Sequence, residues 1–549
     1  MTDSPRNPRY YTTELLALAF ICIFCFFYGL GSFGLVGADE PRYAQIAREM
    51  LERHDFVTPR LHGEVWLEKP ILYYWQAALA FKLFGVSDWA ARLPGAVFAL
   101  CMVAGIYWFM RRFRPGAEFD AAIVTAASAA VLGFARGAST DMQLAAPFTL
   151  AMLCWYAWYQ NGKKWLLLTF YVLLAVGTLA KGPVSPGLAV FILVLFAALR
   201  REWPLLQRTF SILGLLLYCA IALPWYIAVQ LRNPEFLRVF FLQHNLERFA
   251  TNRYQHSQPF WYYGAVLLAS LLPWLAVALP ALFIALRDSI ADWRGHGQAS
   301  EDSANEGGTS AQPENSLRQF VVIWAIFPVL FFSLSRSKLP GYILPAIPAC
   351  TILLGDYLFR NRGSRAPRLI AILHPALMGL LAAGVLLAPN FVLAPKQTPP
   401  SAAVTIAGGV ALAVALGLFV TMKRTGLGAL RPVTALITVM LIWFLLRVAG
   451  PSLDAAFSAR SVERFLESLP VHEKTVAVFH VRRDVEFGLG FYRNEAIPNY
   501  DRNEIPKSAH LLLTYKVTSA ELETAVAGRH TTKLTDFAPQ KLGIYWVAP

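Results

Sequence analysis

Residues 15–35 read LLALAFICIFCFFYGLGSFGL, an apolar run without a single charged side chain. About twenty apolar residues are needed to cross the hydrocarbon core of a bilayer. The run is too long for the apolar region of a cleaved signal peptide, and further apolar runs follow it. We therefore predict a retained membrane-spanning helix here, in a chain that crosses the membrane many times.

The composition of the whole chain also indicates a membrane protein. Of its 549 residues, 56% are hydrophobic and 15% are charged, and its mean hydropathy is +0.45. Soluble proteins carry about 25% charged residues, so lipid must be the solvent for most of this chain. The net charge of +14 does not require a nucleic-acid partner, because membrane proteins keep Lys and Arg in cytoplasmic loops.

About thirteen windows have the length and hydropathy that a span needs. They are residues 14–36, 91–110, 118–136, 143–160, 165–181, 184–199, 209–230, 262–286, 319–334, 341–359, 368–388, 403–421 and 428–449. The segment 71–86 is a further candidate, and the positive-inside rule decides its status.

We place the N-terminus in the cytoplasm. If 71–86 lies on the outer surface, the basic loops fall inside, including Arg111 and Arg112, Lys163 and Lys164, Arg200 and Arg201, and Lys423 and Arg424. If 71–86 spans, they all fall outside. The rule therefore predicts an interfacial helix at 71–86 and an outer C-terminus.

The predicted fold is an α-helical polytopic membrane domain at 1–450 and a small α/β domain at 451–549. The outer loops 37–90 and 231–261 belong to the first domain, and 71–86 is a juxtamembrane helix within the first loop. In the tail, apolar runs at 475–479, 510–515 and 542–548 alternate with helical patterns at 461–469 and 519–527. The polar stretch 295–315 predicts a flexible cytoplasmic linker.

The first outer loop begins ADEPRYA at residues 38–44. Two acidic residues followed by Pro41 are typical of a helix N-terminus. Apolar residues then recur at helical spacing, which predicts a helix that lies on the bilayer with its apolar side down. From spacing alone, Asp39 is equally a helix N-cap or a functional carboxylate.

The outer loops break the positive-inside bias that the rest of the chain obeys. They carry Arg42, Arg48, Arg53, Arg60, Lys69, Lys181, Arg248, Arg253, Arg336 and Lys338. Any one of these could be a solvated charge, but a cluster of cations at the outer interface is what a lipid-phosphate substrate needs. Asp141 and Lys181 sit in short connections between spans, where an ionisable group indicates function.

A metal site is a weaker hypothesis. Glu68 and His256 could bind a divalent ion such as Zn²⁺ or Mg²⁺, although two ligands make a poor signal and a lone loop histidine is more often not a ligand. The sequence indicates no cofactor besides this candidate metal ion. We expect the protein to be a monomer and to have no nucleic-acid partner.

Seven motifs in order define a resemblance. They are Asp-Glu-x-Arg-Tyr-Ala (39–44), Glu-Lys-Pro (68–70), Lys-Gly (181–182), Glu-Arg-Phe (247–249), Gln-His-x-x-Pro-Phe-Trp-Tyr-Tyr (255–263), Leu-Pro-Trp (272–274) and Ser-Lys-Leu-Pro-x-Tyr-Ile-Leu (337–344). From about residue 10 to 450, the chain resembles bacterial 4-amino-4-deoxy-L-arabinose lipid A transferases. These are relatives of protein O-mannosyltransferases with the GT-C architecture. The tail matches no motif.

The resemblance implies transfer of aminoarabinose from undecaprenyl phosphate to a lipid A phosphate at the periplasmic face of the bacterial inner membrane. Such a change would confer resistance to polymyxin and cationic peptides. By position in or beside these motifs, it implies Asp39 and Glu40 as catalytic carboxylates, Lys69, Arg253, Arg42, Lys181 and Lys338 as phosphate ligands, and Tyr43, Arg248 and Tyr342 as cavity-lining residues. Asp141, singled out by its depth, is a further candidate for a catalytic carboxylate.

Two rival functions stay open. The chain could transfer another sugar, such as mannose or galacturonic acid, to lipid or protein, because sugar pockets on this fold use ordinary polar residues. A lipid flippase or transporter is the rival of a different class. We see no internal repeat of the kind that transporters commonly show, and the ionisable residues gather at one interface, which favours chemistry at the surface.

Overall fold

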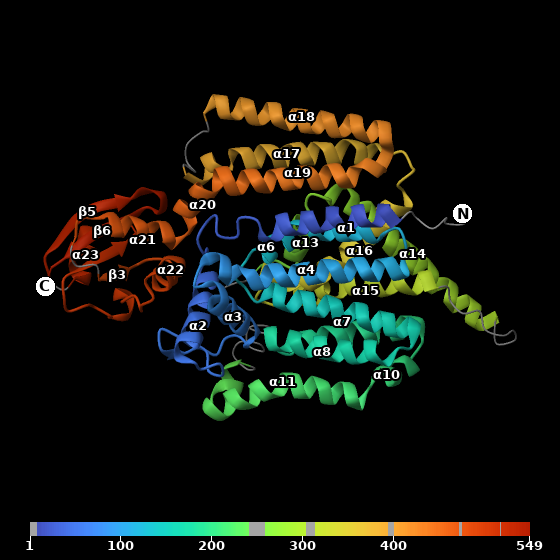
Figure 1. Ribbon diagram of the computed structural model, residues 1–549, viewed down its shortest axis with the longest axis horizontal. Helices are drawn as coiled ribbons and strands as arrows, with labels where there is room; N and C mark the ends of the chain where they lie inside the picture. The colour runs from blue at the N-terminus through green and yellow to red at the C-terminus, as the bar shows by residue number, and fades with distance from the viewer. Residues whose placement is uncertain are drawn as a thin grey trace.

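The computed structural model describes residues 8–240, 258–302, 313–393, 400–471, 475–515, 518–526 and 528–548. Figure 1 shows a bundle of long, roughly parallel helices with a smaller sheet-containing domain at one end, where the C-terminus lies. Helices α2 (Asp39–Arg53) and α3 (Leu72–Phe84) lie at this same end of the bundle, which we call the α2 end. The N-terminus lies at the opposite end.

The bundle consists of helices that follow one another along the chain. The first half comprises α1 (Pro8–Cys22) with η1 (Ile23–Phe27), α4 (Asp88–Phe113), α5 (Glu118–Ala126), α6 (Ala129–Ala135), α7 (Asp141–Asn161), α8 (Lys164–Lys181), α9 (Val184–Arg200), α10 (Pro204–Thr209) and α11 (Ile212–Arg232). The second half comprises α13 (Tyr262–Ser270), α14 (Leu275–Asp302), α15 (Pro313–Ser333), η3 (Pro340–Ala346) with α16 (Ile347–Arg360), α17 (Arg368–Leu393), α18 (Ser401–Thr425), η4 (Gly426–Ala429), and α19 (Leu430–Phe444) with η5 (Leu445–Ala449).

The predicted class of α-helical polytopic membrane protein is confirmed. By length and hydropathy, eight helices in the described part of the chain can cross a membrane, or ten if the bent pairs α5–α6 (60°) and α13–α14 (116°) each form one span. The remaining predicted windows fall on helix α7 and on two shorter apolar helices, Thr12–Phe27 and Val184–Arg200. The first window, 14–36, extends beyond its helix, which ends at Phe27.

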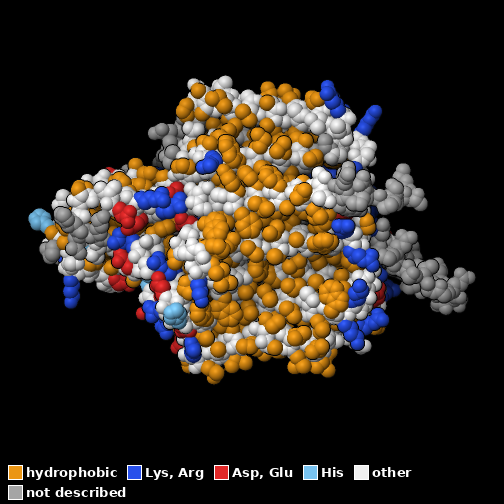
Figure 2. All heavy atoms as spheres, in the orientation of Figure 1, with side chains coloured by type: hydrophobic (Ala, Val, Ile, Leu, Met, Phe, Trp, Pro, Cys, Tyr) orange, Lys and Arg blue, Asp and Glu red, His pale blue; other side chains and the backbone are white. Residues whose placement is uncertain are grey.

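The surface of the bundle carries a broad hydrophobic band across the helices, as Figure 2 shows. Exposed side chains such as Leu16 (67%), Leu216 (61%) and Leu380 (70%) contribute apolar surface to the bundle. On a soluble protein, an apolar patch of this extent would be an interaction surface. In a membrane protein, such a band is the surface that contacts the lipid chains. Lys and Arg gather at the end opposite the C-terminal domain, and acidic side chains gather at the α2 end.

Helix α3 is too short to cross the membrane, as the predicted interfacial helix would be. Its 13 residues rise about 20 Å at 1.5 Å each, which is less than the hydrocarbon core of about 30 Å. The predicted apolar face of α2 exists, because Tyr43, Ile46, Ala47 and Met50 are buried. The surface that covers it is not lipid, however. This face packs in one apolar cluster with residues of α3, so the expected contact of α2 with the bilayer is wrong.

A buried ion pair fixes the N-terminus of α2 to the bundle. Glu40 Oε2 lies 2.6 Å from Nη2 of Arg92 on α4, and Arg92 is 1% exposed. Glu40 also accepts hydrogen bonds from the backbone amides of Val36 and Ala138, both at 2.8 Å. Arg92 donates to the carbonyls of residues 30, 33 and 34. The pair is therefore well supplied with hydrogen bonds, as a buried pair must be.

The C-terminal domain contains a four-stranded sheet of order β3-β4-β6-β5, in which only β3 and β4 pair in parallel. Its elements are α20 (Gly450–Phe457), α21 (Ala459–Ser468), β3 (Val476–Phe479), α22 (Arg483–Arg493), η6 (Tyr500–Arg502), β4 (His510–Thr514), α23 (Ser519–Ala525), β5 (Thr531–Phe537), η7 (Ala538–Gln540) and β6 (Leu542–Val547). The three predicted strands and two predicted helices are present. Helix α22 and strand β5 were not predicted.

The predicted linker at 295–315 is wrong over its first part. Helix α14 continues to Asp302, and α15 begins at Pro313. Residues 303–312 lie outside the described residues.

We expect Arg92→Ala to destabilise the fold strongly. It leaves the Glu40 carboxylate buried without a counter-charge, and breaking a buried pair in this way costs about 3–5 kcal/mol. Thermal unfolding of the purified protein in detergent measures the effect, with exposed Arg112→Ala as the matched control. Equal unfolding temperatures for Arg92→Ala and the wild-type chain would contradict the assigned role of the pair.

Candidate functional site

Asp39 lies in the first turn of α2 and does not cap the helix. The N-cap residue is Ala38, and no side chain bonds to the free amides of this turn. Asp39 Oδ1 lies 2.5 Å from Nη2 of Arg42, one helical turn further on, while 60% of the Asp39 side chain is exposed. The structure thus favours a carboxylate that is oriented by a cation and open to a ligand.

Arg42 is the buried partner in this pair, with 8% of its side chain exposed. It lies between two carboxylates, because Glu68 Oε2 is 3.3 Å from the same Nη2 atom. Its guanidinium carbon is also 5.2 Å from the ring of Tyr43 and 5.0 Å from the ring of Trp66. We call Asp39, Arg42, Tyr43, Trp66 and Glu68 the Arg42 cluster.

The electrostatics of the Arg42 cluster keep Arg42 charged and Tyr43 neutral. Burial alone lowers the pKa of Arg42, but Tyr43, Glu68 and Asp39 together raise it above its usual value. Burial, with the nearby Asp39 charge, raises the pKa of the Tyr43 phenol well above its ordinary range. The Tyr43 phenol is therefore neutral near pH 7.

A second ion pair joins the ends of two neighbouring helices. Lys181 Nζ, at the end of α8, lies 2.5 Å from Oδ1 of Asp141, the first residue of α7. The same ammonium lies 5.6 Å from the centroid of the Tyr342 ring. A Cβ atom on Gly341 would come within 2.2 Å of Asp141 Oδ1, so any larger residue there would have to displace this carboxylate.

The two groups of residues lie at the same end of the bundle. Ala138, whose amide donates to Glu40, comes three residues before Asp141. Glu40 in turn directly follows Asp39. The structure therefore brings together Asp39, Arg42, Tyr43 and Glu68 in one cluster, and Asp141, Lys181 and Tyr342 in another.

The other predicted phosphate ligands have different surroundings. Lys338 is buried, and its Nζ donates to the carbonyls of Ser335 at 2.6 Å and Gln258 at 3.1 Å. Lys69 follows Glu68 directly and is partly exposed in the segment between β2 (Glu64–Val65) and α3. Arg248, Arg253 and His256 lie outside the described residues.

The described residues do not form a metal centre. No three His, Cys, Asp or Glu side chains come together in this part of the chain. Glu68 lies against the cationic Arg42, which is a poor environment for a second cation. The pairing of Glu68 with His256 stays a prediction, and no step of the chemistry below depends on it.

Three residues of this region were not predicted from the sequence. Arg92 could have been identified from the sequence, because a charged residue near the start of an apolar window is unusual. Trp66 stands beside the Glu-Lys-Pro motif, where aromatic residues are ordinarily read as an interfacial belt. Phe487, on α22, reaches the Arg42 cluster from the C-terminal domain, and no local pattern indicates that contact.

This arrangement holds charged groups in fixed positions at the α2 end. Positive charge at Arg42 and Lys181 is fixed beside carboxylates at the edge of an apolar bundle. Charges held in a fixed, partly dry position stabilise developing charge with little reorganisation. Arg42 and Lys181 are neutralised by these carboxylates, but the buried Nε of Arg42 has no acceptor among the described residues and could donate to an anionic oxygen.

Comparison with known proteins agrees with this chemistry. Residues 12–240 match the family described as dolichyl-phosphate-mannose-protein mannosyltransferase. A protein of Edwardsiella ictaluri named undecaprenyl phosphate-alpha-4-amino-4-deoxy-L-arabinose arabinosyl transferase is 33% identical over 60% of this chain. That alignment spans 57% of the relative, a little over half its length. The protein of the same name from Aeromonas salmonicida is 30% identical over 78% of this chain and 75% of the relative.

A solved structure shares the fold over nearly the whole chain. The crystal structure of ArnT from Cupriavidus metallidurans bound to undecaprenyl phosphate superposes with a TM-score of 0.71 and 24% identity. The match covers 97% of this chain and 98% of that one. It therefore includes the C-terminal domain, for which the sequence offered no motif.

We expect the Asp141–Lys181 pair to be energetically coupled. Lys181→Met and Asp141→Asn should each lower the thermal unfolding temperature in detergent, because each leaves one group of a partly buried pair without its partner. The double variant should lose less free energy of unfolding than the two single variants lose together, and the difference should be about 1 kcal/mol or more. Strictly additive losses would show that the two side chains do not interact.

Proposed function

The chain belongs to the family of undecaprenyl phosphate-α-4-amino-4-deoxy-L-arabinose arabinosyl transferases, and we propose that it transfers aminoarabinose from undecaprenyl phosphate to a phosphate of lipid A. The observation that carries this proposal is the exposed Asp39 carboxylate held 2.5 Å from buried Arg42 at the end of an apolar bundle. An oriented carboxylate and a fixed cation at the membrane boundary fit the exchange of a sugar between two lipid anions.

We place the α2 end on the periplasmic side of the bacterial inner membrane. Exposed Arg112 and Lys423 lie in the last turns of α4 and α18, and exposed Lys163 and Arg201 lie in connections between helices, all on the other side of the bundle. Positive charge marks cytoplasmic loops, which supports this orientation. Lipid A and the sugar-carrying lipid would then reach the α2 end from within the outer leaflet.

Cations at the α2 end would hold the two phosphates. Lys69 is proposed to bind the phosphate of the donor as a point charge, and Arg253 is a second candidate for the same group. Lys181 is paired with Asp141, and Lys338 donates to two carbonyls. These two lysines already have partners, so we assign them to lining the site and not to neutralising the charge of a ligand. Tyr342, beside Lys181, and Tyr43, beside Arg42, are proposed to line the sugar-binding site together with Arg248.

The transfer step breaks one bond and forms another. An oxygen of the acceptor phosphate attacks the anomeric carbon, and the bond from that carbon to the undecaprenyl phosphate oxygen breaks. The bonding electron pair leaves with undecaprenyl phosphate, where the cations neutralise the growing charge. The attacking phosphate is already anionic near neutral pH, so a strong base is not required.

Asp39 and Glu40 would have different roles. Asp39 is exposed, so it can orient the acceptor, stabilise positive charge on the sugar ring or pair with the sugar's ammonium group. Both oxygens of Glu40 are occupied by Arg92 and two backbone amides. We therefore assign Glu40 to positioning α2 and Asp39 to contact with the reacting groups, with Asp141 as a second carboxylate.

A different sugar or acceptor is the second candidate. The match of residues 12–240 to a mannosyltransferase family favours a related transfer from a polyprenyl phosphate to lipid or protein. Aminoarabinose adds a positive charge to lipid A, so the proposed reaction would weaken the binding of polymyxin and other cationic peptides. The rival reaction predicts no such change.

Mass analysis of lipid A tests the proposal. Cells that lack the gene should gain the mass of aminoarabinose on lipid A when the wild-type chain is restored. Asp39→Asn keeps the shape of the side chain and removes its charge, and we expect it to lower transfer about 100-fold or more. Asp55→Asn, which alters an ion pair with Arg232 beyond the C-terminal end of α2, is the matched control.

Three outcomes would count against these assignments. Unmodified lipid A with the wild-type chain would contradict the function, and an adduct of a different mass would favour the rival sugar. Full modification with Asp39→Asn would remove this carboxylate from the mechanism.

A further inference from the structure

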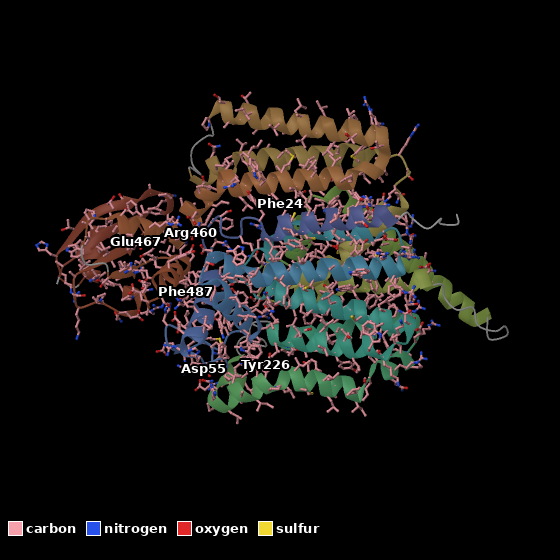
Figure 3. All side chains as sticks on the ribbon, viewed as in Figure 1. Phe24, Asp55, Tyr226, Arg460, Glu467 and Phe487 are labelled. Carbon is pink, nitrogen blue, oxygen red and sulfur yellow. The ribbon has the colours of Figure 1, made fainter. Side chains whose placement is uncertain are left out.

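The C-terminal domain contributes a side chain to the Arg42 cluster. Phe487 on α22 places its ring centroid 5.7 Å from the guanidinium carbon of Arg42. Figure 3 shows Phe487 at the junction between the C-terminal domain and α2. Its ring packs against the apolar cluster of α2 and α3, so this side chain is directed away from its own domain and toward the candidate site.

Phe487 completes an aromatic enclosure around one charge. Trp66, Tyr43 and Phe487 lie within 5.0, 5.2 and 5.7 Å of the Arg42 guanidinium carbon. Aromatic faces attract a guanidinium and restrict the orientation of its plane. Two of the three rings come from the first loop, and the third is present only when the C-terminal domain is docked.

One donor of Arg42 has no partner in the described part of the chain. Its Nη2 atom lies near Asp39 and Glu68, but its buried Nε has no hydrogen-bond acceptor among the residues that the structure describes. A buried N–H without a partner is costly. An oxygen of an anionic ligand would satisfy this donor. Because the aromatic rings restrict the orientation of the guanidinium, they also fix the direction in which Nε donates to that oxygen.

We propose that Phe487 is a positioning residue through which the C-terminal domain holds Arg42 in place for glycosyl transfer. Resting on the proposed function above, the inference adds that Arg42 Nε donates to an oxygen of the glycosyl phosphate group as it departs. Phe487 does not touch the reacting atoms. It acts by closing the third side of the enclosure around Arg42.

The docking of the C-terminal domain does not depend on Phe487 alone. Asn494, near the end of α22, accepts a hydrogen bond from Gln45 at 3.1 Å and donates to Glu52 at 3.3 Å. Tyr492 donates to Asp88 at 2.6 Å, and Arg460 pairs with the same carboxylate at 2.7 Å. These contacts hold the domain without touching Arg42, so the ring can be changed while the domain stays docked.

The test uses the purified full-length chain in detergent, with undecaprenyl phosphate-aminoarabinose as donor and lipid A as acceptor. Phe487→Leu keeps an apolar side chain but removes the ring, and Phe487→Tyr keeps the ring. We expect Phe487→Leu to lower kcat about 5–10-fold, to change the donor KM less than about twofold, and to unfold within a few degrees of wild type. Phe487→Tyr should retain most of the wild-type kcat.

Two controls separate positioning from docking. Asn494→Ala weakens the contact of α22 with α2 away from Arg42, and we expect a wild-type kcat. In an Arg42→Lys background, which lacks the planar cation, Phe487→Leu should cause no further loss. These results together would support an action of Phe487 through Arg42.

Other results would overturn the inference while the proposed function stands. They are a wild-type kcat for Phe487→Leu, an equal loss for Asn494→Ala, and an undiminished effect of Phe487→Leu in the Arg42→Lys background. A wild-type chain that transfers no sugar under these conditions would instead contradict the proposed function, on which the inference rests.

Discussion

The buried pair between Glu40 and Arg92 is the interaction on which the α2 end depends. A carboxylate removed from water must have a counter-charge and hydrogen bonds, and Arg92 with two backbone amides supplies them. Through these contacts, one side chain of α2 is tied to α4, to the segment before α2 and to the segment that leads to Asp141. The Arg42 cluster and the Asp141–Lys181 pair are thereby held at one end of the bundle.

Exposure distinguishes Glu40, which we assign to positioning α2, from Asp39, which we propose for the chemistry. Glu40 and Asp39 are neighbours in the chain, and each is paired with an arginine. The Glu40 side chain is 11% exposed and its arginine 1%, whereas Asp39 is 60% exposed. Both carboxylate oxygens of Glu40 are bonded within the protein, whereas the exposed side of the Asp39 carboxylate can bind a ligand. The sequence motif that contains both residues cannot distinguish them.

Much of the fold follows from local patterns, and the exceptions have physical reasons. The length of the apolar runs located the spans, and the helical spacing of apolar residues located the buried face of α2. Spacing cannot say what covers that face, so the packing of α2 on α3 was read as contact with lipid. The linker predicted at residue 295 is helical to Asp302 because polarity alone does not end a helix.

The site was predictable only in part for the same reason. Asp141 and Lys181 were singled out because charges at membrane depth are rare, and Asp39 because it lies at the start of the helix in the first outer loop. The contact of Phe487 with Arg42 joins residues far apart in the chain, and α22 itself was missed because Gly488 and Gly490 lower the helix propensity of its sequence. Only the folded chain brings the C-terminal domain to the first loop.

Transfer between two lipid anions at the α2 end requires this end to face the periplasm. Single cysteines in a variant without the six native cysteines test that orientation in spheroplasts with a membrane-impermeant maleimide. Glu64→Cys lies in the exposed hairpin after α2, and Lys163→Cys lies in the exposed turn between α7 and α8 at the other end. We predict that Glu64→Cys is labelled in intact spheroplasts and Lys163→Cys only after lysis. The reverse pattern would place Asp39 and Arg42 in the cytosol and contradict the proposed chemistry.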